Sequence, residues 1–156
     1  MKGSILMGGL LGFTAIFAGA LWYFQNYAYY SVERPDDFTI ALTLVADGAP
    51  ERILARDFTV MLSDTSPLKF RACFTVVNSI PMMTETYVVY DKPTPLQAPG
   101  WFECFDYVAL TEDLQSGQAV AFLAEKDITN GVDRVVAVYD DGRAYSWHQL
   151  NEKFAD

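Results

Sequence analysis

The sequence contains a single histidine, His148, and only two cysteines among its 156 residues. A histidine-centred hydrolase needs a nucleophile, a base and an orienting group, so one histidine argues against that class. The common zinc sites need more nitrogen and sulfur ligands than this chain offers, and no Cys-x-x-Cys pair is present. We therefore expect no bound metal, no cofactor and no redox-active cysteine pair.

Nucleotide-binding and glycosidase signatures are missing as well. No glycine-rich phosphate loop follows an expected strand, and no dinucleotide fingerprint occurs. Adjacent carboxylates occur at Asp36-Asp37, Glu112-Asp113 and Asp140-Asp141. Glu112-Asp113 is explained by the start of a helix, and Asp140-Asp141 is explained by a turn. Nothing points to the pair of acidic residues that a glycosidase uses. We expect that the protein is not an enzyme.

Basic residues are scarce: the chain has 11 Lys and Arg against 20 Asp and Glu, a net charge of −9. Nucleic acids and anionic lipid surfaces attract basic faces, so we expect no nucleic-acid partner. The acidic balance would suit a basic partner, although ordinary solubility is the simpler explanation.

Charge is absent from Gly3 to Val32, and Ile5 to Phe24 form a nearly continuous apolar run of 20 residues. As one helix, such a run crosses a hydrocarbon core of about 30 Å. Aromatic residues typical of a membrane interface gather at its end: Trp22, Tyr23, Phe24, Tyr27, Tyr29 and Tyr30. We expect residues 1–31 to be a membrane anchor in contact with lipid.

A cleaved signal peptide is the alternative interpretation of this segment. Residues 5–17 would form its apolar region, and Ala18-Gly19-Ala20 matches a cleavage pattern. However, apolar and aromatic residues continue through that position, which favours a permanent anchor. Lys2 and the N-terminal amine favour a cytoplasmic N-terminus, so the C-terminal domain is expected outside the cytoplasm.

Small residues recur at intervals of three and four along the expected span: Ser4, Gly8, Gly12, Ala15 and Gly19. They share one helical stripe, where small residues allow a second membrane helix to approach closely. The alternative is that glycine is simply common in membrane spans. The stripe does not tell whether a partner helix would belong to a second copy or to another integral membrane protein.

The two cysteines, Cys73 and Cys104, lie 31 positions apart, each among aromatic residues. In an oxidising compartment a disulfide closing such a loop contributes about 3–4 kcal/mol. We expect this disulfide, with two buried thiols as the alternative.

The remaining sequence predicts an α+β fold, with an antiparallel sheet and at least one packed helix. Residues 32–37 form a polar joint, and residues 38–156 form the domain. Strands are expected at 38–45, 69–77, 84–90 and 101–108, a loop at 91–100, and a helix from Thr111 to Glu125 or Lys126. Residues 51–62 fit a helix or a strand. Asn130-Gly131 predicts a turn or a helix C-cap, Asp140-Asp-Gly142 predicts a hairpin between 135–139 and 143–147, and a terminal helix is expected at 148–154.

Three polar residues stand within or beside the expected strands. Arg71 and Arg134 have apolar neighbours, and partly buried ion pairs with Asp106 or Asp133 would accommodate them. His148 follows the expected hairpin, where we interpret it as a surface residue.

The segment from Pro95 to Asp106 combines a proline-rich approach with aromatic residues and carboxylates. One interpretation is an edge loop held to the sheet by the disulfide. The other is a rigid contact surface for a partner, because aromatic anchors dominate protein interfaces. The residues that would form this contact are Trp101, Phe102, Glu103 and Asp106.

Four segments together resemble a family of short single-span alphaproteobacterial proteins of uncharacterised function. They are Asn26–Tyr30, Asp64–Phe74, Pro95–Asp106 and Gly131–Ala137. The resemblance implies a Gram-negative inner membrane with a periplasmic domain, and it transfers no catalytic residue. Some members are labelled histidine kinases; this chain has neither the nucleotide-binding glycine boxes nor the length for a kinase domain.

These observations favour a non-catalytic accessory subunit or assembly factor of a larger inner-membrane complex. A respiratory complex is one such host, because an acidic periplasmic module would attract a basic electron carrier. The alternative is a free-standing periplasmic domain that binds or senses a small ligand in an apolar pocket. An enzyme ranks third.

Overall fold

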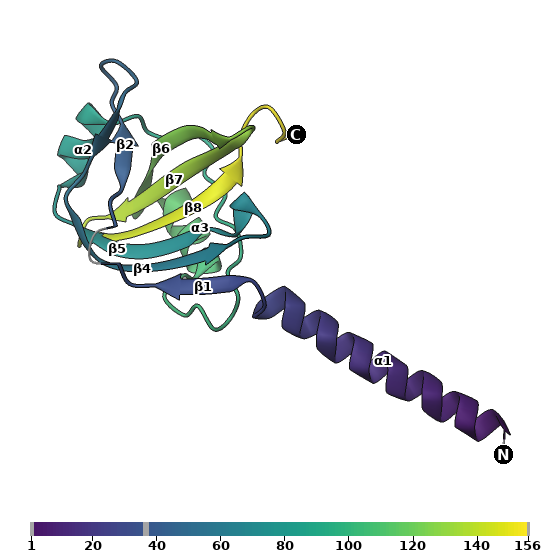
Figure 1. Cartoon of the computed structure of the whole chain (residues 1–156). Coiled ribbons are helices and arrows are strands. Elements are labelled where there is room, and N and C mark those ends of the chain that lie inside the picture. The colour runs from purple at the N-terminus through teal and green to yellow at the C-terminus, as the bar shows by residue number, and fades with distance from the viewer. Residues whose placement is uncertain (1, 36–37, 156) are drawn as a thin grey trace. The chain divides into compact units, whose positions relative to one another are not determined.

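The computed structural model describes residues 2–35 and 38–155 (Figure 1). The predictions about Asp36 and Asp37 therefore lie outside the described residues. The chain divides into two compact units, Met1–Tyr30 and Ser31–Asp156. Each unit is described by itself.

The first unit is helix α1, Lys2–Asn26, which has no buried residue. Its 25 residues correspond to a length of about 37 Å at 1.5 Å per residue. The one polar side chain near its middle, Thr14, donates to the Leu10 carbonyl oxygen over 2.9 Å. Among the described residues, α1 is the one helix long and apolar enough to cross a membrane, and a signal sequence passes the same test.

The second unit contains a six-stranded sheet in the order β1-β4-β5-β8-β7-β6. The strands are β1 (Tyr30–Glu33), β4 (Ala55–Ser63), β5 (Arg71–Val76), β6 (Ala119–Thr129), β7 (Val132–Tyr139) and β8 (Arg143–Leu150). All pairs from β4 to β6 are antiparallel. The predicted turns at Asn130-Gly131 and Asp140-Asp-Gly142 are confirmed, as they join β6 to β7 and β7 to β8. The first two residues of the predicted joint belong to β1.

A small sheet and a short helix cover the first face of the large sheet. The small sheet pairs β2 (Ala41–Thr43) with β3 (Pro50–Arg52), and the helix is α2 (Ile80–Thr86). The segment after α2 connects the two sheets, because Val88 N–H donates to the Thr43 carbonyl and Tyr90 N–H donates to the Ala121 carbonyl. Burial of the apolar side chains between these layers drives their association.

The core between these layers uses alternate residues of each strand. On β5 these are Ala72, Phe74 and Val76, and on β7 they are Val136 and Val138. Such alternation is the signature of a strand with one face on this core. The remaining members come mainly from β2, β4, α2 and β6: Ile40, Leu42, Ile53, Phe58, Val60, Phe70, Met83, Tyr87, Phe122, Ala124 and Ala144.

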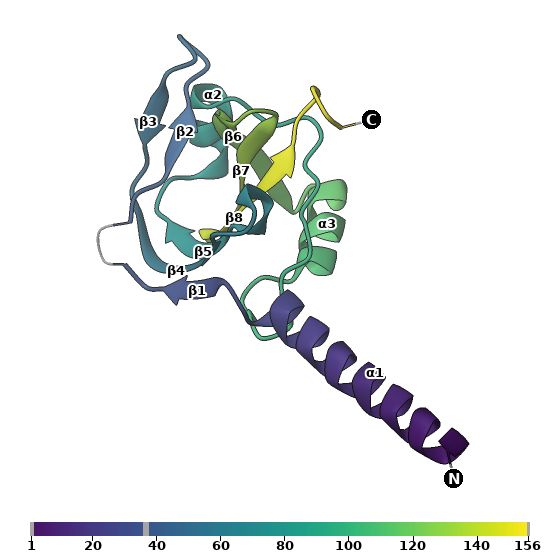
Figure 2. The ribbon, with the colours of Figure 1, turned by 45° about the vertical axis from the view of Figure 1, so that its right-hand side comes forward.

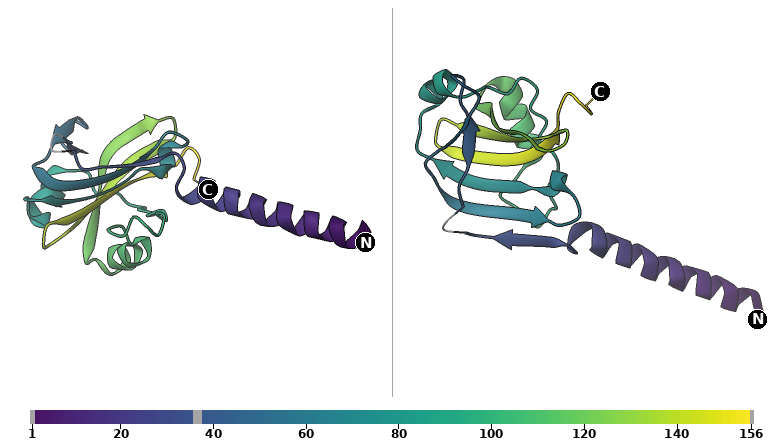
Figure 3. Two further views of the ribbon diagram at one scale, coloured as in Figure 1. Left: turned by 60° about the horizontal axis from the view of Figure 1, so that its bottom comes forward. Right: turned by 45° about the horizontal axis from the view of Figure 1, so that its top comes forward.

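The second face of the large sheet carries helix α3, Tyr107–Ser116, on the side opposite to β2 (Figures 2 and 3). The chain reaches α3 through residues 91–106, a segment without regular structure that we call the strap. A 3-10 helix, η1 (Pro67–Lys69), precedes β5.

The α+β prediction is confirmed, but four element predictions are wrong. Residues 84–86 of the strand expected at 84–90 are instead the end of α2, which Pro81 favours because its missing N–H costs nothing in the first turn of a helix. Residues 101–106 are not a strand, because they belong to the strap. The last predicted helix is also wrong, since His148 to Leu150 extend β8.

The predicted helix from Thr111 begins four residues earlier and ends nine residues earlier than the sequence suggested. Asp106 caps its start, and Gly117, with φ of +79°, ends it in a left-handed conformation. Residues 119–129 then form β6, although alanine-rich sequence favours a helix in isolation, because pairing with β7 decides their conformation.

Candidate functional site

The strap lies on the second face of the sheet because side chains of β5 and β8 hold it there. The predicted disulfide between Cys73 and Cys104 is present, with a Cα–Cα distance of 6.3 Å. Cys73 lies on β5 between residues of the first face, so its side chain points to the second face. The disulfide therefore fixes the C-terminal part of the strap to the middle of the sheet.

Arg71, on the same face of β5, holds the middle of the strap. Its Nε donates to the Leu96 carbonyl over 2.9 Å and its Nη2 donates to the Gln97 carbonyl over 3.0 Å. Its Nη1 donates to the carbonyls of Leu68 and Phe70. Hydrogen bonds from a charged donor contribute about 1.5–3 kcal/mol each, which offsets the cost of burying this guanidinium.

Gln149, near the end of β8, holds the N-terminal part of the strap. Its Oε1 accepts from the Thr94 N–H over 2.7 Å, and its Nε2 donates to the Lys92 carbonyl over 3.0 Å. The same Oε1 accepts from the Trp147 indole over 2.9 Å. Three attachments of different chemistry thus hold the strap along its length.

Helix α3 is fixed by its two ends. The Asp106 carboxylate accepts from the N–H groups of Val108 and Ala109, which satisfies two of the free donors at the helix start. Near the other end, the Tyr139 hydroxyl on β7 donates to Asp113 over 2.7 Å. Burial, together with the Asp113 charge, raises the pKa of Tyr139, so this hydroxyl keeps its proton.

A half-open cavity of about 850 Å3 lies where the start of the strap meets the ends of β6, β7 and β8. Its apolar lining comes from Leu68, Val88, Val89, Leu96, Leu123, Leu150 and Ala155. Its polar lining comes from Tyr90, Asp91, Lys92, Thr94, Lys126, Asp133, Gln149, Asn151 and Glu152. Volumes of 300–1,000 Å3 with mostly apolar walls are typical of small-molecule sites.

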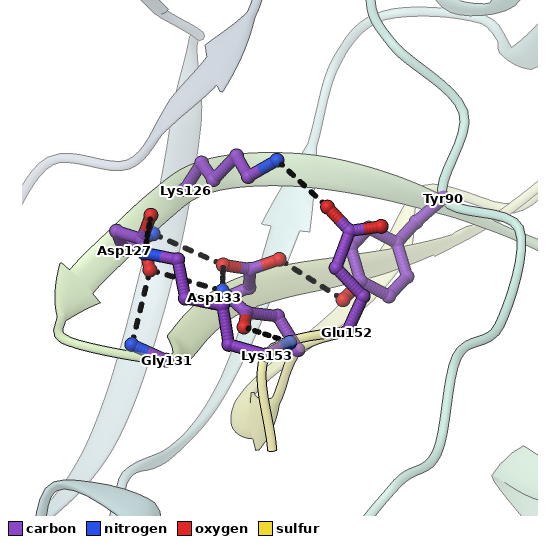
Figure 4. A network of polar contacts seen from close by, with 8 residues as sticks. Tyr90, Lys126, Asp127, Gly131, Asp133, Glu152 and Lys153 are labelled. Atoms are coloured by element: carbon purple, nitrogen blue, oxygen red, sulfur yellow. Dashed lines mark hydrogen bonds and ion pairs between the residues drawn. The ribbon is translucent and has the colours of Figure 1, made fainter. Parts of the chain in front are cut away.

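Asp133, a buried residue, belongs to the polar lining of this cavity, and its carboxylate is part of the network in Figure 4. Its Oδ2 accepts from the Tyr90 hydroxyl over 3.0 Å. Its Oδ1 accepts from the Asn151 side chain over 2.8 Å and from the Asp127 N–H over 3.0 Å. Burial, followed by the Asp133 charge, raises the pKa of Tyr90, so the phenol remains a donor at neutral pH.

Asp127 extends this network to the C-terminal segment (Figure 4). Its carboxylate accepts from Lys153 Nζ over 2.8 Å, and also from the Asn151 side chain and the Gly131 N–H. These three donors, Lys153 foremost, lower the pKa of Asp127 to about 2. The network therefore holds the C-terminal turn against the β6–β7 turn.

The chemistry available in the cavity is binding and hydrogen bonding. Within residues 2–35 and 38–155, every buried side-chain nitrogen or oxygen has a partner, and no three acidic, histidine or cysteine side chains form a metal-binding group. Asp133 and Asn151 are already engaged in the network. The buried side-chain nitrogens and oxygens of the described lining residues are consequently all paired.

His148 lies on the first face of the sheet, outside the cavity lining, and is 6% exposed, so its prediction as a surface residue is wrong. The predicted ion pairs are wrong too. Arg134 donates to the His148 ring, and Arg71 donates to the carbonyls described above. The donors to Asp133 are uncharged: the Tyr90 hydroxyl, the Asn151 side chain and the Asp127 N–H.

The four residues predicted to contact a partner differ in accessibility. Phe102 is buried within the domain and Trp101 is half-buried, whereas Glu103 and Asp106 are exposed. The Asp106 carboxylate also caps α3. Only the two carboxylates therefore offer fully accessible side chains, and their role in partner contact stays a prediction.

The stripe of small residues on α1 is exposed throughout: Ser4, Gly8, Gly12, Ala15 and Gly19. A Cβ added at Gly8 or Gly12 would meet no other atom within 4 Å. The glycines thus serve no packing purpose inside the described part of the chain, and their role in helix association stays a prediction.

Sequence reasoning missed the cavity and most of the residues that build it. Tyr90, Asp133, Gln149 and Asn151 are dispersed over 62 positions, and no motif connects them. The one available signal is the alternation on β8, which places Gln149 on the same face as Trp147 once the hairpin register is known.

Comparison with known proteins identifies a family but no activity. The model of a family described as "Family of unknown function (DUF6446)" matches residues 40–156, and the chain belongs to this family. No curated protein and no solved structure matches the chain. The match covers the α+β domain except its first strand and leaves α1 outside.

Proposed function

For this member of a family of unknown function, we propose a role as a membrane-anchored, non-catalytic accessory subunit or assembly factor of a larger inner-membrane complex. The observation that carries the proposal is the direct connection of helix α1, which has no charged residue after Lys2, to a domain closed by a disulfide. This combination suits a protein held at a membrane with its domain in an oxidising compartment.

The disulfide supports a periplasmic position for the domain. Cytosolic thiols are kept reduced, whereas disulfides persist in the bacterial periplasm. Cys104 is exposed, so it would be open to cytosolic reductants if the domain faced inwards. A cytoplasmic N-terminus with a periplasmic domain follows from this argument.

Helix α1 supports membrane anchoring and association with an integral membrane protein. Its 25 residues exceed the roughly 20 needed to cross a bilayer. The glycines of the stripe leave room for a neighbouring backbone, and close packing is the main source of helix association in lipid.

The domain suits a rigid contact module rather than a catalyst. Its strap is held by Cys73, Arg71 and Gln149, so exposed groups such as Glu103 keep a fixed position. The net charge of −9 would attract a basic partner on the periplasmic side, including a basic electron carrier if the host is a respiratory complex.

The decisive experiment is extraction of the full chain from its native membrane in mild detergent, using a small C-terminal tag. We expect a defined set of membrane proteins to co-purify at stoichiometric amounts. Gly8→Leu and Gly12→Leu should lose these partners while the domain keeps its unfolding midpoint. Gly9→Leu is the matched control, because it makes the same change about 100° around the helix from Gly8 and about 60° from Gly12.

Two results would contradict the proposal in different ways. The tagged chain emerging alone, or only as its own dimer, would reject the accessory role. Equal loss of partners in Gly8→Leu and Gly9→Leu would leave the accessory role standing and reject the stripe as the contact.

A further inference from the structure

We infer that the cavity beside the strap is a binding site for a small uncharged amphiphile, with an apolar body and one hydrogen-bonding group. The site involves residues 88–96 of the strap region and the ends of β6, β7 and β8. It goes beyond the accessory role and does not depend on it.

The cavity is held open by the bonds that place its walls. Gln149 fixes the Lys92 and Thr94 backbone on one side, and the Tyr90–Asp133 hydrogen bond fixes the start of the strap on the other. Because these bonds already exist, a ligand need not order the walls, which removes one of the main costs of binding.

The apolar side chains of the lining supply the driving force. Six of them are large, and two of these, Val89 and Leu150, are 44% and 40% exposed. Covering such surface contributes about 25 cal/mol per Å2. The walls therefore favour a ligand that is mainly apolar.

The charged side chains of the lining are of both signs and mostly engaged with one another or with donors, which argues for an uncharged ligand. Two lysines and three carboxylates line the cavity, and Lys126 and Glu152 pair with each other at 3.3 Å. Lys92 would attract an anion, but the adjacent Asp91 would repel it. The same two residues oppose a cation, and the third carboxylate, Asp133, is buried and already accepts from three donors. An ion would lose hydration without gaining a dedicated partner.

A single hydrogen-bonding group on the ligand is matched by two exposed polar residues of the lining, Lys92 and Thr94. A ligand hydroxyl beside these two side chains can bond to them or to water, so it always has a hydrogen-bond partner.

The test uses the full chain in lipid nanodiscs with methyl-labelled Leu and Val, observed by NMR. The probes are 1-octanol, octanoate and octylammonium, which share one apolar chain and differ in charge. We expect 1-octanol to shift the methyl signals of Leu68, Leu96, Leu123 and Leu150 in a saturable way. Because the ions lose hydration on entry, their apparent affinities should be at least about tenfold lower.

Two variants separate the cavity from other apolar surface. Val89→Trp places a large ring in the cavity, so the shifts should disappear while the unfolding midpoint is kept. Val77→Trp makes the same change at an exposed position outside the lining and should leave binding intact.

Methyl shifts that do not saturate with 1-octanol, or that persist unchanged in Val89→Trp, would contradict a binding site in this cavity. An equal affinity for 1-octanol and for octanoate or octylammonium would contradict the proposal that the ligand is uncharged. The methyl signals report on the cavity alone, so these results are independent of whether membrane partners co-purify.

Discussion

The Nε2 atom of His148 accepts a hydrogen bond from Nε of Arg134 over 3.0 Å, so this buried imidazole is neutral. Its Nδ1 lies 2.6 Å from the Pro67 carbonyl oxygen, which can only accept, and the proton therefore resides on Nδ1. Phe70 stacks on the ring at a centroid distance of 4.3 Å. Burial is the main cause that lowers the pKa of His148 to about 4, and the charges of Arg134 and Arg71 lower it further.

This lowered pKa predicts that the domain loses stability in mild acid. The unfolded histidine has a pKa of 6.5, so below that pH the unfolded state binds more protons than the folded state. The contribution of the neutral His148 to the free energy of unfolding is complete above about pH 6.5 and is lost as the pH falls towards 4. We expect the free energy of unfolding to decrease by about 2 kcal/mol between pH 7.5 and pH 5, measured by urea unfolding of the full chain.

The His148→Gln variant provides the control for this pH dependence. It should be less stable than the wild type at pH 7.5, because the stacked ring is lost, but its stability should change much less between pH 7.5 and 5. Asp127, with a pKa of about 2, does not titrate in this window. A wild-type stability that is flat over this range would contradict the assignment of His148 as the titrating group.

The disulfide predicts a large dependence of stability on reductant. Opening the Cys73–Cys104 loop should lower the free energy of unfolding by about 3–4 kcal/mol in the chain-entropy estimate. The measurement is the unfolding midpoint with and without reductant. Wild type should shift downwards on reduction, whereas the Cys73→Ser, Cys104→Ser variant should start at the lower midpoint and not respond. An equal response of both proteins would mean that the reductant acts elsewhere.

Gln149 predicts a local effect on the strap that the rest of the domain does not share. Gln149→Met leaves the Thr94 N–H without its acceptor and the Lys92 carbonyl without its donor. Hydrogen exchange at the Thr94 amide should become at least about tenfold faster, since the strap would open locally. Amides in the β7–β8 ladder should keep most of their protection.

The exposed residue Gln118 supplies a matched control for this change. Gln118→Met should leave exchange at Thr94 unchanged. If Gln149→Met accelerated exchange equally in the strap and in β7, the effect would be global destabilisation rather than release of the strap.

Local sequence signals predicted the β7–β8 hairpin and the turn at Asn130-Gly131 correctly because adjacent residues encode these turns. Asp140-Asp-Gly142 and Asn130-Gly131 each supply a glycine at the position where the chain needs a positive φ, +90° at Gly142 and +78° at Gly131. No distant residue is required for these turns, so a short stretch of sequence is sufficient to predict them.

Residues 91–100 of the strap were predicted correctly as a loop, whereas residues 101–106 were mistaken for a strand because their aromatic residues favour strands locally. Phe102 and Phe105 are instead buried against the second face of the sheet, where Phe105 meets the Trp147 ring edge-on at 6.4 Å. Their burial depends on Cys104 being joined to β5, a contact that spans 31 positions. Asp106 is a residue type that commonly caps helices, but this role was not predicted because residues 101–108 were expected to form a strand.

The cavity could not be predicted because its walls come together only after the sheet has formed. Tyr90 reaches Asp133 over a separation of 43 residues, and Gln149 reaches Lys92 over 57. Neither pair lies on one element, and the two pairs come together because the register of β7 with β8 places Asp133 opposite Gln149.

Gly131 and Gly117 form a natural pair for testing contact between the C-terminal turn and the β6–β7 turn. Both have nearly the same positive φ, +78° and +79°, so alanine should cost a similar amount in backbone strain at each, about 1–2 kcal/mol. They differ in surroundings: a Cβ at Gly131 would overlap the ring of Phe154, whereas at Gly117 it would meet nothing within 4 Å.

Gly131→Ala should therefore lower the unfolding midpoint more than Gly117→Ala. The difference measures the displacement of Phe154 from the turn, and it should vanish when Phe154→Ala is present in both backgrounds. Because the Phe154 side chain is 55% exposed, we expect this extra loss to stay below about 1 kcal/mol. Equal losses in the two single variants would show that Phe154 moves aside without cost, and that the polar network around Asp127 and Asn151 holds the C-terminal turn by itself.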